Sequence, residues 1–235
     1  MRGDAAPAFV FVAELPDAGA SGSLDPDESH HVVRVCRAAA GDRLHATDGR
    51  GALARLRLTA AGSPATFEVE TLDRQAPAGM TCVACGAPEG ARADWVIEKL
   101  AEFGILHFQP LDTARARWRW SGGRRARFER LALAGLKQSM QRFRLEIRDP
   151  LPLETWLAGL GGGEARWLAD RDGSTPGPEG LEAMRPWLGV GGPAGGFTPG
   201  ERESLIGVGF EPVRLAKGVL RAETAAVALA ARRAG

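Results

Sequence analysis

The chain has 235 residues, a formal net charge of +1, 44% hydrophobic residues and 25% charged residues. These proportions are those of an ordinary globular protein, so they exclude a wholly disordered chain and a coiled coil, and the length suits one large domain or two small ones. No apolar run approaches the roughly 20 residues that span a bilayer, and the N-terminus lacks the layout of a signal peptide. We therefore expect a cytoplasmic protein with no membrane partner.

The first third of the chain has the pattern of a small β-barrel. Short runs of alternating residues predict strands at 9–14, 44–47, 52–58 and 66–72. Glycine-rich turns separate the last three runs, which is typical of a barrel. A helix is predicted to begin after the capping residue Asp25 and to end before Gly41. We expect this barrel to occupy residues 1–73, followed by a linker rich in alanine, proline and glycine.

The remainder of the chain alternates strands with helices. Strands are predicted at 81–85, at 106–111, at 166–169, up to Val190 and at 212–215. Helices are predicted at 91–103, 124–143, 199–208 and 220–233, with loops at 160–163 and 173–180. This alternation predicts an α/β domain over residues 80–235, in which helices cover both faces of a parallel sheet.

The three cysteines are Cys36, Cys82 and Cys85, and such a sparse, odd number fits a reducing compartment. The CxxC spacing of the last two also occurs in metal and redox sites. Here the pair lies in a run typical of a buried strand, where residues three apart point to opposite faces. No second Cys/His pair with the spacing of a zinc site follows. We favour the buried strand and expect no metal.

Positive charge is concentrated in one segment. Residues 111–148 hold eleven lysines and arginines against three acidic residues, whereas the rest of the chain has 19 against 26. Trp118 and Trp120 lie among these arginines; guanidinium groups match phosphate geometry, and aromatic rings stack on unpaired bases. The segment is either a solvated surface or a nucleic-acid contact, and its charge favours contact with RNA or DNA. A smaller basic patch contains His30, His31, Arg34 and Arg37.

Two loops have the features of a ligand site. Gly189-Val-Gly-Gly-Pro-Ala-Gly-Gly196 follows a predicted strand, and glycines at such a position let backbone groups approach a ligand closely. Thr198 and Glu201 have the spacing of a capping box, so a helix begins directly after this loop. The alternative is a tight turn without a ligand. The second segment, 215–225, brings Arg221, Glu223 and Thr224 together, and it is either a second ligand loop or an ordinary helix N-terminus.

Eight motifs, taken in chain order, carry a family resemblance. They are His30-His-Val-Val-Arg-Val-Cys-Arg37, Gly41-Asp42, Asp48-Gly-Arg-Gly51, Glu98-Lys-Leu-Ala-Glu-Phe-Gly104, Pro110-Leu111, Lys137-Gln-Ser139, Gly192-Pro-Ala-Gly-Gly-Phe197 and Val219-Leu-Arg-Ala-Glu-Thr-Ala225. With these motifs the chain resembles, over nearly its whole length, the RsmE family of ribosomal RNA uridine-N3 methyltransferases in the SPOUT superfamily. The last motif is the most specific.

The resemblance implies a fold and a reaction. The fold is an N-terminal PUA-like β-barrel followed by a C-terminal SPOUT α/β domain with a deep trefoil knot, a rare exception to the rule against threading. The knot loops bind S-adenosylmethionine, and a homodimer shares the site for ribosomal RNA or the small ribosomal subunit. The product is N3-methyluridine in 16S ribosomal RNA. The N3 proton must leave, so a base or a stabiliser of the uracil anion is needed, and the target base must be unpaired or flipped.

The resemblance also implies site residues. By position, the cofactor contacts are Leu168, Ala169, Val190, Gly191, Gly192, Gly195, Gly196, Leu215, Ala216, Val219, Leu220, Arg221 and Thr224. Two candidate catalytic residues are Arg221, which would stabilise negative charge on the uracil, and Glu223, which would accept the proton or orient Arg221. The candidate RNA contacts are His30, Arg34, Arg37, Arg115, Arg117, Arg119, Arg124, Arg125, Gln138 and Arg142.

Two positions depart from the family pattern. Ala194 stands where the family's Gly-Pro-Glu-Gly-Gly has glutamate, and Leu215-Ala-Lys-Gly218 stands where the family has Leu-Gly-Pro-Arg. Ala216 would be strained if its backbone needed a positive φ. Two alternatives therefore stay open: a catalytically weak RNA-binding protein that retains the knot, and a methyltransferase of the same superfamily that acts on another RNA.

Overall fold

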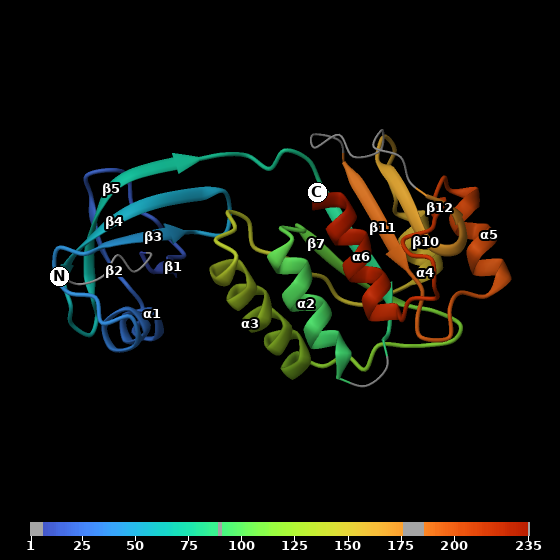
Figure 1. Cartoon of the computed structure of the whole chain (residues 1–235), viewed down its shortest axis with the longest axis horizontal. Helices are drawn as coiled ribbons and strands as arrows, with labels where there is room; N and C mark the ends of the chain where they lie inside the picture. The colour runs from blue at the N-terminus through green and yellow to red at the C-terminus, as the bar shows by residue number, and fades with distance from the viewer. Residues whose placement is uncertain (1–6, 89–90, 176–185, 235) are drawn as a thin grey trace. The chain divides into compact units, whose positions relative to one another are not determined.

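The computed structural model describes residues 7–88, 91–175 and 186–234 (Figure 1). The chain divides into two compact units. The first consists of Met1–Pro77 together with Leu136–Arg144, and the second of Ala78–Gly135 together with Leu145–Gly235. Among the described residues, no helix has both the length and the apolar character needed to cross a membrane.

The first unit is built on a five-stranded sheet. Its strands are β1 (Phe9–Phe11), β2 (Ser21–Ser23), β3 (Arg43–Thr47), β4 (Ala52–Ala60) and β5 (Thr66–Arg74), in the order β1-β3-β4-β5-β2. The four predicted strands are present. The additional strand β2 consists of serine and glycine and therefore has no hydrophobic alternation to reveal it. Side chains such as Leu44, Leu56 and Phe67 fill its core.

A short helical segment follows β2, as predicted. Asp25 caps α1 (Pro26–His30) by accepting a hydrogen bond from the backbone N–H of Glu28 at 2.8 Å. The helix then widens into the π-helix η1 (His31–Val35), which is followed by Arg37 at a φ of 56°. The segment therefore ends within the predicted span, at a left-handed residue that is not glycine.

The second unit is an α/β fold. Its parallel sheet contains β6 (Thr81–Gly86), β7 (His107–Asp112), β8 (Glu146–Ile147), β10 (Ala165–Ser174), β11 (Trp187–Gly191) and β12 (Glu211–Val213), in the order β12-β10-β11-β6-β7-β8; β9 (Leu151–Pro152) pairs with β7. The helices are α2 (Arg92–Glu102), α3 (Gly122–Gln138), α4 (Leu153–Ala158), α5 (Pro199–Gly207) and α6 (Ala222–Ala234). The short elements α4, β8 and β9 were not predicted.

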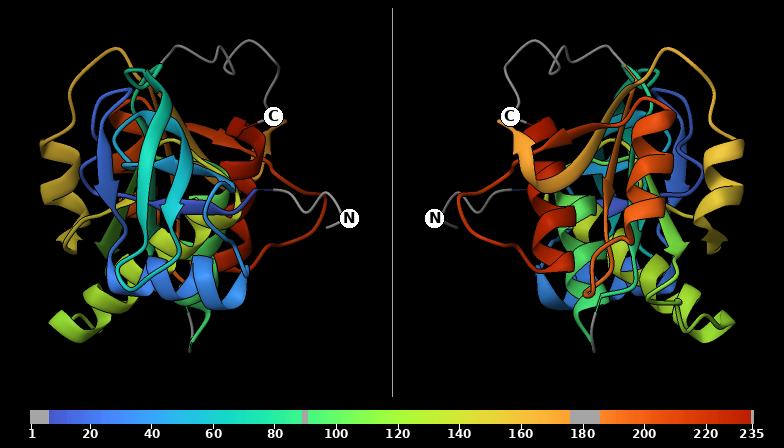
Figure 2. Two further views of the ribbon diagram at one scale, coloured as in Figure 1. Left: turned by 90° about the vertical axis from the view of Figure 1, so that its left-hand side faces the viewer. Right: turned by 90° about the vertical axis from the view of Figure 1, so that its right-hand side faces the viewer.

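Helices cover both faces of this sheet, as the sequence predicts. In the right-hand view of Figure 2, the strands stand between α6 and α5. Residues of α2 and α6 pack with Cys85 on one face, and residues of α4 and α5 pack with Cys82 on the other. The prediction that the two cysteines point to opposite faces of a buried strand is therefore confirmed. Burial raises the pKa of each thiol to about 12, so both stay protonated near neutral pH.

Two predicted spans need correction. The helix predicted at 124–143 ends at Gln138, because Met140 adopts a φ of 53° and the N–H of Gln141 turns back to the carbonyl of Leu136. A left-handed residue commonly ends a helix, and here it is not the glycine that would signal the end. Of the loop predicted at 173–180, Gly173 and Ser174 belong to β10, and 176–180 lie outside the described residues.

Candidate functional site

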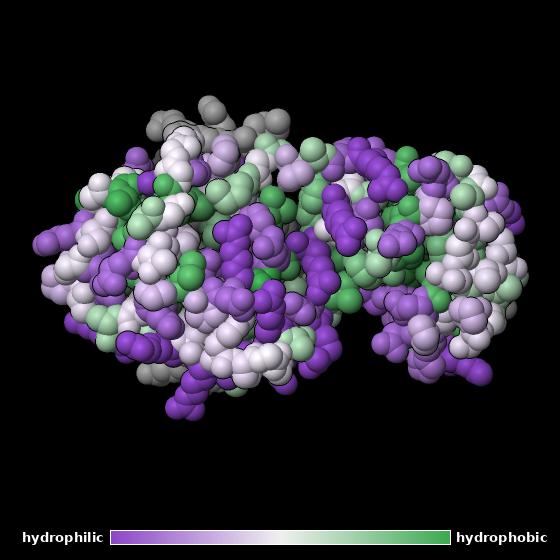
Figure 3. Space-filling view, turned by 180° about the vertical axis from the view of Figure 1, so that it is seen from behind, coloured by the Kyte–Doolittle hydropathy of each residue, from purple (hydrophilic) through white to green (hydrophobic). Residues whose placement is uncertain are grey.

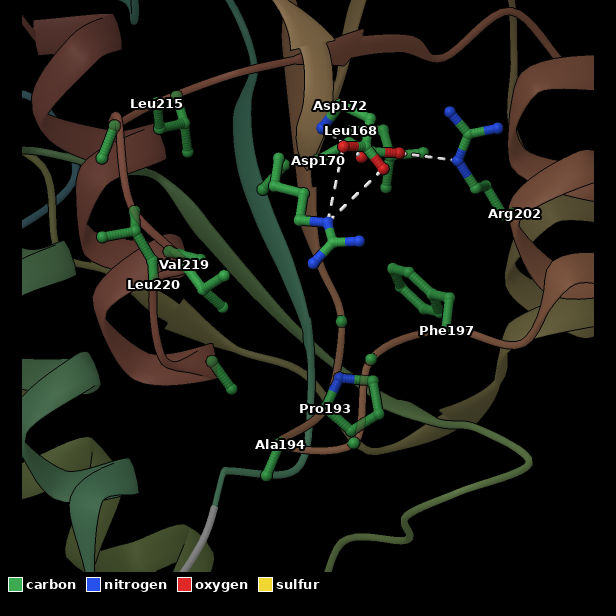
Figure 4. Close-up of a pocket in the computed structure, with 18 of the residues that line it drawn as sticks. Leu168, Asp170, Asp172, Pro193, Ala194, Phe197, Arg202, Leu215, Val219 and Leu220 are labelled. Atoms are coloured by element: carbon green, nitrogen blue, oxygen red, sulfur yellow. Dashed lines mark hydrogen bonds and ion pairs between the residues drawn. The ribbon is translucent and has the colours of Figure 1, made fainter.

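A cavity of about 580 Å³ lies at the carboxyl ends of β10 and β11 (Figure 4). Three segments form most of its wall: 168–172 within β10, 192–197 after β11, and 215–222, which connects β12 to the first residue of α6. The carboxyl edge of a parallel sheet is where α/β proteins bind ligands, and the volume falls within the range of small-molecule sites.

Close backbone packing fixes the loop at 192–197. A Cβ on Gly86, at the end of β6, would lie 2.5 Å from the backbone nitrogen of Pro193, so only glycine fits against this loop. Gly196 has a φ of +69°, in the left-handed region. The guanidinium of Arg115 donates through Nη1 to the carbonyl of Gly195 at 2.6 Å. These contacts hold the loop in one shape beside the cavity.

The helix that follows the loop begins at the predicted capping box. The hydroxyl of Thr198 accepts from the N–H of Glu201, and the carboxylate of Glu201 accepts from the N–H of Thr198 at 2.8 Å. The same carboxylate accepts from the N–H of Ala114 at 2.7 Å. Burial alone would raise the pKa of Glu201, but these hydrogen bonds outweigh it and lower the pKa. Glu201 therefore ties the start of α5 to the segment after β7.

One wall of the cavity is charged. Asp170 accepts through Oδ2 from Nε of Arg202 at 2.6 Å and through Oδ1 from the N–H of Asp172 at 2.9 Å. Arg171 and Asp172 form a more exposed ion pair with a closest separation of 3.4 Å. Figure 4 shows Asp170 and Asp172 beside Leu168, with Arg202 facing Asp170 from α5.

The opposite wall is apolar. Leu215, Val219 and Leu220 come from the loop between β12 and α6, and Figure 4 shows them facing the charged wall across the cavity. Ala216 also lines this wall, and among the described residues the non-glycine positions with positive φ are Arg37 and Met140. The backbone at Ala216 therefore carries none of the strain considered from the sequence.

The structure brings most of the predicted cofactor residues together. Those that line the cavity are Leu168, Ala169, Gly192, Gly195, Gly196, Leu215, Ala216, Val219 and Leu220. Val190 and Gly191 are buried in β11, and Arg221 and Thr224 do not line the cavity. The sequence reasoning missed the charged lining residues Asp170, Arg171, Asp172 and Arg202, because their chain segments carry no motif.

The two candidate catalytic residues lie at the start of α6, outside the cavity lining. Arg221 is exposed. Glu223 is buried, and its Oε1 lies 3.3 Å from Nε of Arg92, with which it forms an ion pair. This pairing gives Glu223 a role in anchoring α6 to α2, and the catalytic roles of both residues stay predictions.

The basic segment disperses over several environments. Arg115 is held against the glycine loop, Arg125 pairs with Glu129 and Asp149, and Arg124 lies over the ring of Phe128 at 5.8 Å. The prediction that Trp118 stacks on bases is wrong, because its ring is buried between Phe108 and Phe128 and its indole N–H donates to the carbonyl of Cys85. Trp120 is half-buried, and its indole donates to Asp149.

The remaining RNA candidates divide into exposed and structural residues. The exposed ones are His30, Arg34, Arg37, Arg117, Arg119 and Gln138. Arg142 instead donates to the carbonyl of Gly51 at 2.8 Å and pairs with Asp73, so it holds the first unit together. On the face drawn in Figure 3, hydrophilic and hydrophobic side chains are interspersed. Contact with RNA stays a prediction for all ten candidates.

Comparison with known proteins identifies the class. A model described as an RNA methyltransferase domain matches residues 74–233, and a model described as an RNA methyltransferase PUA domain matches residues 24–71. The chain therefore belongs to the RNA methyltransferases that carry an N-terminal PUA domain.

Relatives narrow the class to one family. The ribosomal RNA small subunit methyltransferase E of Mycobacterium bovis is 30% identical over 95% of this chain and 90% of its own. The chain belongs to the ribosomal RNA small subunit methyltransferase E family, which confirms the resemblance inferred from the motifs. A probable rRNA-methyltransferase from Porphyromonas gingivalis has a similar structure, with a TM-score of 0.81 at 28% identity over 96% of each chain. The methyltransferase E of Neisseria gonorrhoeae, bound to S-adenosyl methionine, has a TM-score of 0.84 at 22% identity over 96% of each chain, and shares the fold.

Proposed function

We propose that this chain transfers the methyl group of S-adenosylmethionine to N3 of a uridine in 16S ribosomal RNA. The observation that carries the proposal is the cavity at the carboxyl ends of β10 and β11, built from the segments that the family motifs assign to the cofactor. Membership of a family of ribosomal RNA methyltransferases supports the substrate. The relative from Neisseria gonorrhoeae supports the cofactor.

The residues of the cavity fit this cofactor. The apolar side chains of Leu168, Leu215 and Leu220 would flank a purine ring, and the backbone groups of the loop at 192–196 would hydrogen-bond its edge. The charged wall would meet the polar parts of the molecule. When bound, S-adenosylmethionine supplies a methyl group on a positively charged sulfur, which a nucleophilic nitrogen can attack.

The chain must also manage the proton on N3 of the uracil. We assign to Arg221 the stabilisation of negative charge that develops on the ring, since its exposed guanidinium follows directly on the cavity-lining Leu220. The ion pair of Glu223 with Arg92 favours a positioning role for this carboxylate at the start of α6 over proton transfer. The exposed basic residues would contact the phosphates of the RNA, so binding should weaken as salt rises.

The finer features of the fold belong to the same proposal. The five-stranded sheet of the first unit is consistent with a PUA-like barrel. The second unit, with strand order β12-β10-β11-β6-β7-β8, is consistent with a SPOUT domain that contains a deep trefoil knot. The protein would act as a homodimer, and light scattering coupled to size exclusion would measure its mass in solution.

Nucleoside mass spectrometry tests the reaction. Ribosomal RNA from a deletion strain should lack N3-methyluridine, and restoring the gene should bring it back; persistence of the nucleoside in the deletion strain would refute the proposal.

The role of Arg221 has its own test. Arg221→Ala should lower turnover while S-adenosylmethionine still binds, and native turnover in this variant would reject the role given to Arg221. One observation favours a second candidate function, that of an RNA-binding protein with weak methyltransferase activity: the exposed Ala194 stands where the family pattern has a glutamate. Failure of the native chain to bind S-adenosylmethionine in calorimetry would support that candidate.

A further inference from the structure

The proposed function gives no individual role to Asp170, a carboxylate in the charged wall of the cavity. Asp170 lies on β10, and only 13% of its side chain is exposed although it lines the cavity. Leu168, two residues earlier on the same strand, also lines the cavity, as do the residues between Leu168 and Asp172. The pairing of β10 with β12 shifts register between Ala169 and Ser174, and such irregularities redirect side chains near functional sites.

Asp170 is held in a fixed orientation by two donors. Nε of Arg202 donates to Oδ2 at 2.6 Å, and the N–H of Asp172 donates to Oδ1 at 2.9 Å. Each carboxylate oxygen can accept about two hydrogen bonds, so each keeps capacity for a further donor. The side chain is therefore a preformed acceptor in the cavity wall, with capacity for a further hydrogen bond on each of its two oxygens.

The charge around Asp170 selects the kind of donor. Because Arg202 already balances its negative charge, Asp170 gains less from a second cation than an unpaired carboxylate would. A neutral hydroxyl group that leaves water to bind such an acceptor loses little free energy, because its hydrogen bond to the carboxylate replaces the hydrogen bond that it made to water. Two adjacent acceptor oxygens match two adjacent hydroxyls, as in the 2′,3′-diol of a ribose.

We propose that Asp170 is a positioning residue that accepts hydrogen bonds from the ribose diol of the nucleoside cofactor. The inference rests on the proposed function, which places an adenosyl group in this cavity. In this arrangement the apolar side chain of Leu168, on the same strand, would lie toward the base, and the carboxylate would lie toward the sugar. Asp172 differs, since 73% of its side chain is exposed and it pairs with the similarly exposed Arg171.

Calorimetry with deoxy analogues tests the assignment. The native chain should bind S-adenosylmethionine about 10- to 100-fold more tightly than its 2′-deoxy or 3′-deoxy analogue, as expected for the loss of a hydrogen bond to a charged group. Asp170→Asn should weaken binding of S-adenosylmethionine by a similar factor and should bind parent and analogues with nearly equal affinity. Thermal melting of the variant checks that it is folded.

A further variant serves as a control. Asp172→Asn should keep the native discrimination between the parent and the deoxy analogues, because its backbone N–H still donates to Asp170. Undiminished discrimination in Asp170→Asn would overturn the inference while leaving the proposed function intact. Equal affinity of the native chain for parent and analogues would overturn it even if the variant did not fold. No binding of S-adenosylmethionine to the native chain would overturn both.

Discussion

Replacing Gly86 with alanine should disturb the cavity at the ends of β10 and β11, although Gly86 does not line it. Gly86 ends β6 and does not line the cavity, but a Cβ there would lie 2.5 Å from the backbone nitrogen of Pro193 and 2.9 Å from its Cα. An ordinary contact begins near 3.4 Å. Since the obstacle is backbone rather than a flexible side chain, the loop at 192–196 must move by about 0.9 Å, close to the 1 Å misplacement that can cost about 100-fold in function.

The size of the effect follows from overpacking. Forcing a methyl group into a filled space costs about 1–3 kcal/mol. If this cost falls on the loop at 192–196, which binds the cofactor in the proposed function, affinity for S-adenosylmethionine should drop by about 5- to 150-fold, since each 1.4 kcal/mol is a factor of ten. Calorimetry measures the affinity, and thermal melting should register a loss of several degrees.

A matched glycine provides the control for Gly86→Ala. Gly200 lies in α5, and a Cβ added there would have no heavy atom within 4 Å, so Gly200→Ala should leave both affinity and melting temperature close to native. Native affinity in Gly86→Ala, with an unchanged melting temperature, would refute the argument that this close contact shapes the cavity.

Two further predictions concern ion pairs and hydrogen bonds. Lys137→Ala should lower the free energy of unfolding by about 3–5 kcal/mol, because the side chain of its partner Glu28 is only 5% exposed and would keep a buried, unpaired charge. Lys99→Ala removes a more exposed ion pair and should lower the free energy of unfolding by less than about 1 kcal/mol. Chemical denaturation measures both losses, and equal losses would contradict this reasoning. Folding lowers the pKa of Glu201, so the ionised carboxylate should stabilise the fold at pH values above about 4, the ordinary carboxyl pKa. This contribution should be lost as the pH falls through the lowered pKa. Melting temperatures of the native chain and Glu201→Gln should therefore differ at neutral pH and converge in acid, and a constant difference would count against the assignment.

The features predicted well from the sequence are those with local causes. The capping box of Thr198 and Glu201 involves residues three apart, so its spacing alone predicts the start of α5. Strand alternation likewise places Cys82 and Cys85 on opposite faces without any knowledge of the sheet order. The glycine loop is recognisable because close approach of Gly86 and Pro193, and the positive φ of Gly196, restrict those positions to particular residues.

The features that escaped prediction depend on contacts between distant parts of the chain. The segment 136–144 belongs to the first unit because the hydroxyl of Thr47 donates to the carbonyl of Arg142 and the N–H of Arg144 donates to the carbonyl of Gly49. Nothing in the sequence near Arg142 indicates these partners, so its charge suggested RNA contact instead. The rings around Trp118 bury it in the same way, by tertiary packing that a count of charges cannot foresee.

The position of Asp170 helps to interpret the alanine at 194, where the family pattern has a glutamate. Ala194 is exposed on its loop, so a carboxylate there would face solvent and any molecule that approaches the cavity. Asp170 is only 13% exposed, and Arg202 balances its charge; in our proposal its carboxylate meets the sugar of the bound cofactor instead. The two positions therefore do not substitute for one another. The departure at Ala194 bears on what approaches the cavity, which in the proposed function is RNA, and leaves the proposed acceptor for the sugar, Asp170, in place.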